Sequence, residues 1–528
     1  MHGNPLFYDP MTSQVRGPAQ RPRWQAQPNL ILTFHGRKSD ISWDRWSSAI
    51  SRVHPTHFWI ASCIDRPGPR IAPRIALPMM TTDEDVLSRN PSYEHSLDQA
   101  AAANKPAEKL TGLMLAKEDR WIASLDLPEF ARELKELGKE LQAMEGKADV
   151  EHLHKIVRWS RTCTAFGVLT MAFGVNPLSI AALALGCMTR WTIVAHHVCH
   201  GGFDRLDTGG RYNRFTFGVG SLWRRCVDWL DWMLVEAWNV EHNQLHHYFL
   251  GEDKDPDLVE RNLKLVRDLP KVLLPLKYVL VAFMACTWKW YYYSPNTFKV
   301  LKLNQTRRTG QPTGFTETEE EAPCVLGSWM TPWYKKYFTN VEFFGRVLGP
   351  FFVGRFVLLP LLVAAVAAMC AVLLGAAPAT YAKSAGYYSL INLVLGELAT
   401  NAWAFLVVAT NHCGDDLYRF EGHAAARSPS FYLRQTISSV NFATGTDTID
   451  FVHGWLNYQI EHHLWPDLSM LSYQKAQPLV QAICKRHGVP YVKENVFWRL
   501  KKTVDIAVGN TSMRRFPVAY HLKEDVTM

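Results

Sequence analysis

The sequence predicts an all-α integral membrane protein. Two transmembrane helical hairpins, making four crossings, carry an inward-facing helical cap that holds a histidine-rich metal site. Three observations lead to this fold class: long apolar segments alternate with polar ones, histidines gather in three short windows, and Lys and Arg lie between the hairpins rather than at their tips. Only 20% of the 528 residues are charged and 12% are aromatic, a composition that favours a membrane protein over a disordered chain.

The part of the chain before the apolar segments divides in two. Residues 1–80 are irregular and carry ten Lys and Arg against four Asp and Glu, which fits either an organelle-targeting segment or an ordinary disordered tail. Residues 81–158 are polar and include an amphipathic helix that starts near Asp126 and Pro128. Its apolar stripe predicts packing on the body of the protein, or else on a membrane surface, and consists of Phe130, Leu134, Leu137, Leu141 and Met144.

Residues 159–500 form the expected membrane domain, and 501–528 a C-terminal tail. A membrane-spanning helix needs about 20 apolar residues. Apolar segments of this kind pair into two hairpins, 162–195 with Asn176-Pro177 at its tip, and 356–410 with a nearly uncharged connector.

The segment between the hairpins has a different character. Val272–Tyr293 is apolar but contains Lys277 and Lys289 and ends in an aromatic cluster, so we expect it to lie at headgroup level rather than to cross. We expect residues 304–323 to form a solvated loop. The segment 196–271 contains ten Lys and Arg, which places the long segments on the inner side and the hairpin tips outside.

The histidine windows are the main chemical signal. Of 20 histidines, eight lie in the windows 196–200, 242–247 and 459–463. The first two contain an i, i+4 pair, which on a helix places both imidazoles on one face. Imidazole suits Fe, Zn, Cu or Ni, and eight of them exceed the needs of one tetrahedral zinc. The expected ligands of two metal ions are His196, His200, His242, His246, His247, His462 and His463.

The topology supports a common site. With two hairpins, all three histidine windows reach the same membrane face, because each follows an even number of crossings. If Val272–Tyr293 also crossed, the third window would lie on the opposite face. His412 ends the last crossing at the same depth and joins the expected ligands, while His197, His453 and Gln459 are further candidates that lie beside the motifs.

Metal-bound histidines usually donate their second N–H to a carboxylate or a carbonyl. Several carboxylates near the windows are candidates for this role, and the sequence does not choose among Asp204, Asp207, Glu241, Asp255, Asp257, Asp450, Glu461 and Asp467.

The motifs H-x3-H (His196, His200), H-x3-H-H (His242, His246, His247) and Q-x2-H-H (Gln459, His462, His463) resemble those of the membrane-bound fatty acid desaturases. The stretch from Asn457 to Leu468 is especially similar. A Gln at the start of the third motif resembles the front-end desaturases, although the His-Pro-Gly-Gly mark of their fused haem domain is absent. The resemblance covers about residues 160–500.

The resemblance implies two iron ions, O2 as oxidant, and a C=C bond introduced into a lipid-linked or CoA-linked acyl chain. It implies an external electron donor, either ferredoxin or a separate b-type cytochrome, in a plastid or endoplasmic reticulum membrane. The alternatives are a hydroxylase, ketolase or sphingoid-base desaturase with the same iron centre, or a receptor that has kept the fold without metal. The net charge of +8 is poor evidence for nucleic acid, and motifs of soluble hydrolases are absent.

Overall fold

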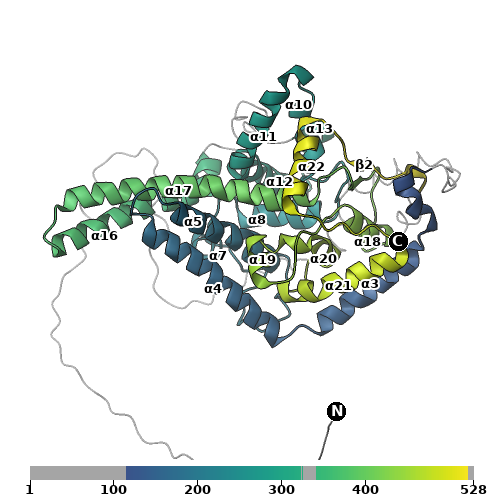
Figure 1. Cartoon of the computed structure of the whole chain (residues 1–528), viewed down its shortest axis with the longest axis horizontal. Helices are drawn as coiled ribbons and strands as arrows, with labels where there is room; N and C mark the ends of the chain where they lie inside the picture. The colour runs from purple at the N-terminus through teal and green to yellow at the C-terminus, as the bar shows by residue number, and fades with distance from the viewer. Residues whose placement is uncertain (1–114, 323, 325–340, 521–528) are drawn as a thin grey trace, which may run out of the picture. The chain divides into compact units, whose positions relative to one another are not determined.

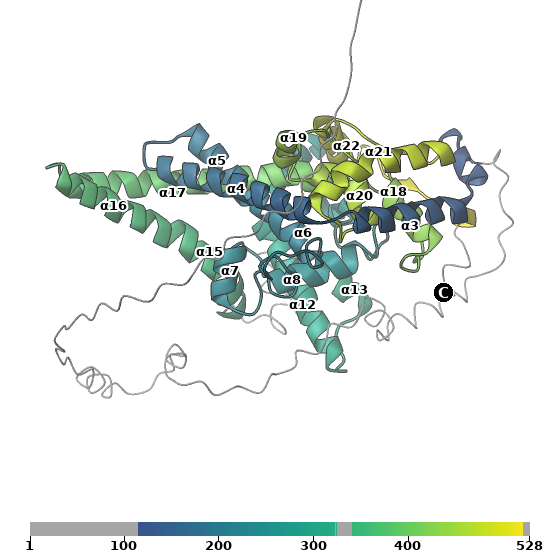
Figure 2. The same cartoon turned by 90° about the horizontal axis from the view of Figure 1, so that it is seen from below.

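The computed structural model describes residues 115–322, 324 and 341–520, and the regular structure there is almost entirely helical. The long helices α4 (Lys147–Thr170), α5 (Pro177–Thr189), α16 (Leu359–Leu373) and α17 (Pro378–Val408) pack together and extend from a helical cap (Figures 1 and 2). The expected N-terminal segment 1–80 lies outside the described residues.

Helices α4 and α5 form the first hairpin. Asn176 caps α5, because its Oδ1 accepts a hydrogen bond from the Leu178 N–H at 3.0 Å. A Cβ at Gly186 would lie 2.3 Å from Thr164 Oγ1, so glycine permits the close approach of the two helices. Because α4 already begins at Lys147, the domain boundary expected at residue 158 falls inside a helix.

Helices α16 and α17 form the second hairpin, which packs on the first. The chain turns after α16 at Gly375, whose φ of +67° lies in the left-handed region that glycine adopts readily. Asn392 of α17 joins the two hairpins, since its Nδ2 donates to the carbonyls of Met171 at 2.8 Å and Gly174 at 2.6 Å. These bonds satisfy carbonyls at the end of α4 and in the turn that follows it.

Four helices in the described part of the chain are long and apolar enough to cross a membrane: Pro177–Cys199, Lys271–Arg308, Val341–Leu373 and Pro378–Asn411. Three of them overlap the crossings expected from sequence. The first expected crossing, at the end of α4, is not among these four, whereas Lys271–Arg308 is. This last helix is long because α11 (Leu274–Trp288), the π-helix η7 (Lys289–Tyr293) and α12 (Ser294–Arg308) are continuous. Its two halves differ, because α11 is largely exposed and α12 is largely buried in the cap.

The expected amphipathic helix is α3 (Leu127–Ala143). Asp126 caps it by accepting from the Glu129 N–H at 3.1 Å, and the predicted stripe is buried up to Leu141. Met144, the last expected member, lies beyond the helix end and is 56% exposed. The helix packs against α18 (Pro429–Ile437) and α21 (Met470–His487), which confirms that it rests on the body of the protein.

The remaining elements complete the cap and its connections to the long helices. The helices are α6 (His196–Cys199), α7 (Leu222–Asp228), α8 (Val235–Trp238), α9 (Val259–Asn262), α10 (Lys264–Arg267), α13 (Glu317–Glu321), α15 (Gly349–Phe352), α19 (Asp447–Val452), α20 (Gln459–Leu464) and α22 (Val496–Val508). The strands β1 (Tyr418–Arg419) and β2 (Arg514–Arg515) pair in parallel. One expectation needs correction: residues 304–323 are partly helical, because α12 runs to Arg308 and α13 follows. Helix α22 continues across residue 500, where the tail was expected to begin.

Candidate metal centre

The first histidine window lies where the helix of the first hairpin enters the cap. A π-helix, η4 (Arg190–Ala195), leads directly into α6, which carries His196, His197 and Cys199. The Nδ1 atom of His196 lies 3.1 Å from the Thr192 carbonyl, and that of His197 lies 2.7 Å from the Ile193 carbonyl. Both rings are therefore oriented by carbonyls of the preceding turn.

The second window forms a π-helix, η5 (Asn239–His246), which brings a further histidine beside His242. In a π-helix the backbone bonds join residues i and i+5, and here the His247 N–H donates to the His242 carbonyl at 3.2 Å. His242 consequently groups with His247, whereas His246 also approaches a different set of histidines. His242 and His246 nevertheless lie side by side, with ring centroids 5.1 Å apart, as expected of an i, i+4 pair on one helix face.

The third window follows a tight turn at Gly454 and Trp455, both with positive φ. A Cβ at Gly454 would lie 2.5 Å from Thr192 Oγ1, so glycine lets this turn pack against η4. The left-handed conformation of a bulky residue such as Trp455 is uncommon, and its buried indole Nε1 donates to the Met470 carbonyl at 3.1 Å. The turn directs α20, with its two histidines, toward the first window.

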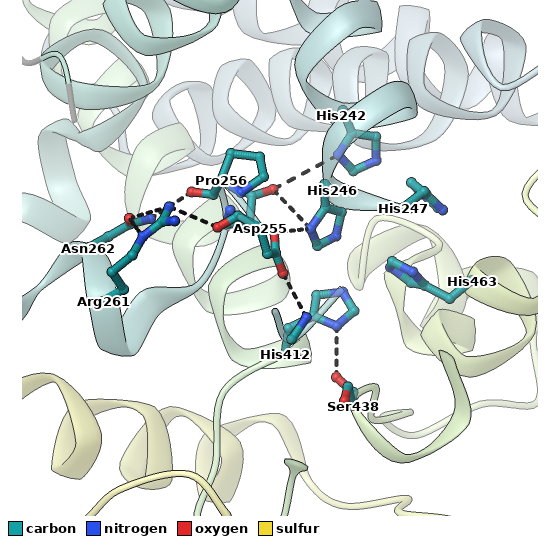
Figure 3. A network of polar contacts seen from close by, with 12 residues as sticks. His242, His246, His247, Asp255, Pro256, Arg261, Asn262, His412, Ser438 and His463 are labelled. Atoms are coloured by element: carbon teal, nitrogen blue, oxygen red, sulfur yellow. Dashed lines mark hydrogen bonds and ion pairs between the residues drawn. The ribbon is translucent and has the colours of Figure 1, made fainter. Parts of the chain in front are cut away.

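The structure brings all eight expected ligands into two groups, and a third cluster of His242, His246 and Asp257 connects them. The ligand nitrogens within each group lie within 4.8 Å of one another. The five-histidine group contains His196, His200, His242, His247 and His462. The three-histidine group contains His246, His412 and His463. Figure 3 shows the second group with its neighbours, contributed by segments far apart in the sequence.

The three further candidates differ in their position relative to the two histidine groups. Gln459 belongs to the centre, since its Nε2 lies 2.9 Å from His412 Nε2 and its Oε1 is buried without a hydrogen-bond partner. His197 is buried beside His462 but is in neither group. His453 lies outside both groups and bonds through Nδ1 to the Ile449 carbonyl at 2.8 Å.

One pattern of hydrogen bonds fixes the tautomers of the centre. In the five expected ligands His196, His246, His412, His462 and His463, Nδ1 faces an oxygen acceptor, so it carries the proton and Nε2 keeps a lone pair. The Nε2 atoms of His200, His247, His462 and His463 are buried and have no hydrogen-bond partner in the described structure. Buried nitrogens of this kind need a partner, and a transition-metal ion supplies one to each.

The contact between the first two windows shows most clearly whether the histidines fit a bound metal ion. The Nε2 atoms of His196 and His242 lie 3.1 Å apart. His196 donates from Nδ1 to a carbonyl, so its Nε2 presents a lone pair, whereas His242 Nδ1 has no hydrogen-bond partner in the described structure. Two nitrogens that bind the same metal ion lie about 3 Å apart, given metal–nitrogen bonds of about 2.1 Å. The residues present therefore fit a bound metal ion.

Among the carboxylates proposed as partners, Asp255 makes the direct contact. His246 donates from Nδ1 to Asp255 Oδ1 at 2.9 Å, and Figure 3 shows the two side chains turned toward each other. Asp257 lies farther away, 3.7 Å from the same nitrogen. Glu241 is fully buried, and its burial, together with the charge of Asp257, raises its pKa well above the ordinary value.

The other five carboxylates stabilise the surrounding fold. Asp450 accepts from Asn457 at 2.6 Å and Glu461 accepts from Asn441 at 2.7 Å, which fixes the two ends of the segment that carries the third window. Asp204 and Asp467 pair with arginines, and Asp207 accepts from a turn N–H.

Electrostatics keep most of these imidazoles neutral. Burial, reinforced by the neighbouring rings, lowers the pKa of His200, His242, His247, His462 and His463 well below the ordinary value, and that of His412 to about 3. For His246, burial acts in the same direction, but Asp255 outweighs it and raises the pKa. Neutral imidazole is the form that binds metal.

Several residues that orient the ligands carry no signal in the sequence. Gln435 Oε1 accepts from His463 Nδ1 at 2.9 Å, and Tyr473 Oη lies 3.3 Å from His462 Nδ1. The Ser438 carbonyl accepts from His412 at 3.0 Å. A backbone carbonyl or a lone Gln or Tyr belongs to no motif, so only the folded structure identifies these partners.

The fold and the site define a helical membrane protein with a buried histidine-rich centre that could hold metal. A model of the fatty acid desaturase family matches residues 175–495, more than half of the chain. The chain therefore belongs to the fatty acid desaturase family and is an oxidoreductase.

Curated relatives agree with this assignment. The NADPH-dependent stearoyl-CoA 9-desaturase of Mycobacterium tuberculosis (strain ATCC 25618 / H37Rv) is 23% identical over 392 residues, covering 72% of this chain and 79% of that protein. The acyl-lipid (8-3)-desaturase of Physcomitrium patens is 29% identical over 121 residues, covering 23% of this chain and 25% of that protein. The Delta(8)-fatty-acid desaturase of Euglena gracilis is 33% identical over 108 residues, 20% of this chain and 24% of that protein. No solved structure matches the chain significantly.

Proposed function

We propose that this desaturase uses O2 to introduce a C=C bond into a lipid-linked or CoA-linked acyl chain, with two iron ions held by the two histidine groups. The observation that supports the proposal is the arrangement of eight buried imidazoles in two adjacent groups, in which four Nε2 atoms have no hydrogen-bond partner in the described structure. One group of this size would serve a single ion, whereas two adjacent groups suit a pair.

The chemistry explains why a metal centre is needed. An unactivated methylene has no acidic proton, so side-chain acids and bases cannot remove its hydrogens. A bound pair of iron ions would supply the oxidising power to do so, with O2 as oxidant. Desaturation consumes O2, two electrons and two protons and releases two waters. The protein's own contribution is to orient the ligands through Asp255, Gln435 and backbone carbonyls, and to bury the centre away from bulk water.

In this proposal the five-histidine group holds one ion and the three-histidine group holds the other. Gln459 adjoins the smaller group, and a rotated side chain would present its unpartnered Oε1 to the ion. His197 acts beside the centre, since its ring packs against His462 and Tyr473.

We also propose that Lys271–Arg308 does not cross the membrane. Near the start of α11, Lys277 Nζ donates to the Val508 carbonyl of α22 at 3.0 Å. At its other end, Trp288 Nε1 donates to the carbonyl of Asn401, close to the inner end of α17, at 3.0 Å. Both ends of α11 thus contact cap-side elements, while Val279 and Phe283 are exposed between them. An apolar helix held in this way suits the headgroup region, and four crossings then come from the two hairpins.

The proposals for the acyl carrier, the electron donor and the compartment rest on the resemblance to fatty acid desaturases. The relatives are named for stearoyl-CoA and for acyl lipids, which supports both carriers. We propose an external donor, either ferredoxin or a separate b-type cytochrome, and a plastid or endoplasmic reticulum membrane.

Expression of the full chain in a host with simple lipids tests the function. Mass spectrometry that locates double bonds should reveal a new unsaturated acyl product, and His462→Ala should abolish it while the protein remains folded. His453→Ala is the matched control, because His453 lies outside both groups. A hydroxylated or keto product would instead indicate the alternative reactions of the same centre, and turnover by the His462→Ala variant would contradict the proposal.

A further inference from the structure

Helix α22 leaves two large aromatic side chains largely exposed. Phe497 and Trp498, in its first turn, are 66% and 59% exposed. The helix begins at Val496, just beyond residue 495, where the match to the desaturase family model ends. The family match therefore gives these two aromatic residues no role.

The opposite face of α22 is fixed to the body of the protein. On this face the buried residues are Val496, Arg499, Thr503, Ile506 and Ala507. Phe497 and Trp498 lie off this stripe, where a helix at a protein surface in water normally carries polar residues. Two large apolar side chains exposed next to each other indicate a surface that contacts something other than water.

The buried face joins α22 to the inner end of α17. Arg499 Nη2 donates to the Cys413 carbonyl at 2.9 Å, and Thr503 Oγ1 donates to the same carbonyl at 3.3 Å. Cys413 follows His412 directly beyond the candidate span Pro378–Asn411. Because both bonds come from the first two turns of α22, the exposed aromatic pair lies close to the level at which this span leaves the membrane.

Two neighbouring elements indicate the same level. At the other end of α22, the Val508 carbonyl accepts from Lys277 of α11, the apolar helix that we assign to the headgroup region. Near the end of α17, Trp403 Nε1 donates to the carbonyl of Val452 in α19 at 3.0 Å, and the Val452 side chain is itself exposed. Trp near the end of a span is typical of the membrane interface.

We propose that α22 is a membrane-interface helix, whose Phe497 and Trp498 side chains insert among the lipids of the leaflet on the cap side. The indole of Trp498 combines an apolar ring with an N–H group, the property that concentrates Trp at membrane surfaces. Lys501 follows Phe497 by four residues and so lies on the same side of the helix, with its side chain exposed. A basic residue beside an apolar pair is typical of helices that lie in the interface.

Helix α22 then connects the bilayer surface to the metal centre. One side of the helix contacts lipid, and the other, through Arg499, holds the carbonyl next to the expected ligand His412. The height of this ligand above the membrane is set by α22 as well as by α17. This role is independent of the reaction that the centre catalyses.

Photo-crosslinking of the purified full chain in phosphatidylcholine vesicles tests this without requiring turnover. The photoreactive residue p-benzoylphenylalanine replaces Trp498 in one variant and Phe497 in a second. The matched control replaces the exposed Lys485, near the end of α21, which packs on α3 at the end of the cap away from the hairpins (Figures 1 and 2). Val366, exposed on α16 within a candidate span, is the positive control.

Intact-protein mass spectrometry measures the yield of lipid adducts. We expect yields at 497 and 498 comparable to that at 366 and above that at 485 by about tenfold or more, as for side chains placed among lipids. Thermal midpoints verify that the variants are folded, and either aromatic position alone provides the test if the other variant does not fold. A yield at these positions as low as at 485 would overturn the proposal. Crosslinks to a second copy of the chain in place of lipid would also overturn it, because the surface would then be a contact between protomers. Desaturation is not measured, so this proposal and the proposed function fail separately.

Discussion

Gln435 holds His463 in place: its Oε1 accepts from His463 Nδ1 at 2.9 Å, while its Nε2 donates to the His247 carbonyl at 3.0 Å. One side chain of α18 thus connects a ligand of the three-histidine group with the backbone of a ligand of the five-histidine group. Such outer partners fix the tautomer and the direction of a metal-binding imidazole.

Replacing Gln435 should therefore weaken metal binding without unfolding the protein. We expect Gln435→Leu to lower iron affinity about 10- to 100-fold. Gln435→Glu should lower iron affinity less, because a carboxylate still accepts a hydrogen bond from His463. Iron retained during dialysis against a chelator measures the effect. Gln481→Leu, on the exposed side of α21, is the control, and equal iron loss in the Leu and Glu variants would argue against this role.

Asp255 should orient His246 for metal binding, as Gln435 does for His463. Asp255→Asn removes the charge that favours Nδ1 protonation while keeping the size of the side chain, so we expect about a tenfold loss of iron affinity or of activity. The exposed Asp268→Asn variant provides the comparison. Unchanged iron content and unchanged turnover in Asp255→Asn would show that the contact at 2.9 Å has no role in the centre.

Asp416 supports the cap through an ion pair with the buried Arg499, at 2.6 Å, and with Lys502. Burial alone would raise the pKa of Asp416, but these cations outweigh it and hold the pKa below the ordinary value. The stabilisation is therefore complete above the unfolded pKa of about 3.9 and is lost as the pH falls through the lower folded value.

Asp416→Asn should lower the free energy of unfolding at pH 7 by about 2 kcal/mol. The difference from the unaltered protein should shrink only below about pH 4, where Asp416 becomes protonated in the unfolded chain while it is still charged in the folded protein. Thermal midpoints measured from pH 7 to 3.5 test this, with the exposed Asp415→Asn as control. A difference that stays constant down to pH 3.5 would mean that the ion pair is not its source.

The topology of Lys271–Arg308 can be tested by tags placed at its two ends. Tags inserted after Asp268 and after Gly310 should be accessible from the same side of the membrane, because α11 contacts cap-side elements at both ends. A tag at Gly375, in the tip of the second hairpin, should be accessible only from the other side. Tags at 268 and 310 on opposite sides would show that this helix crosses.

Much of the site could be predicted from sequence because its ligands form compact motifs on helices. All eight expected ligands, including the isolated His412, lie in the two groups. The contact of His242 with His247 could not be predicted, because a π-helix has no clear sequence signature and adds a neighbour at position i+5 to the expected one at i+4.

For the fold as well, elements with a local sequence pattern could be predicted, whereas those that depend on contacts between distant segments could not. The stripe of α3 and the hairpin tips follow from periodicity and from Asn176-Pro177. The continuity of α11 with α12 could not be predicted in this way. The polar residues that end the apolar segment in the sequence are buried inside the cap, where Ser294 and Asn296 form hydrogen bonds. Orienting residues such as Gln435 depend on contacts between distant segments and carry no local pattern.

Iron content per chain, measured in the purified protein and in two variants, tests the central claim most directly. We predict about two iron ions in the unaltered protein, and about one in each of His200→Ala, from the five-histidine group, and His412→Ala, from the three-histidine group. Iron content near zero in the unaltered protein, or content that neither substitution changes, would contradict the assignment of these two groups as metal sites.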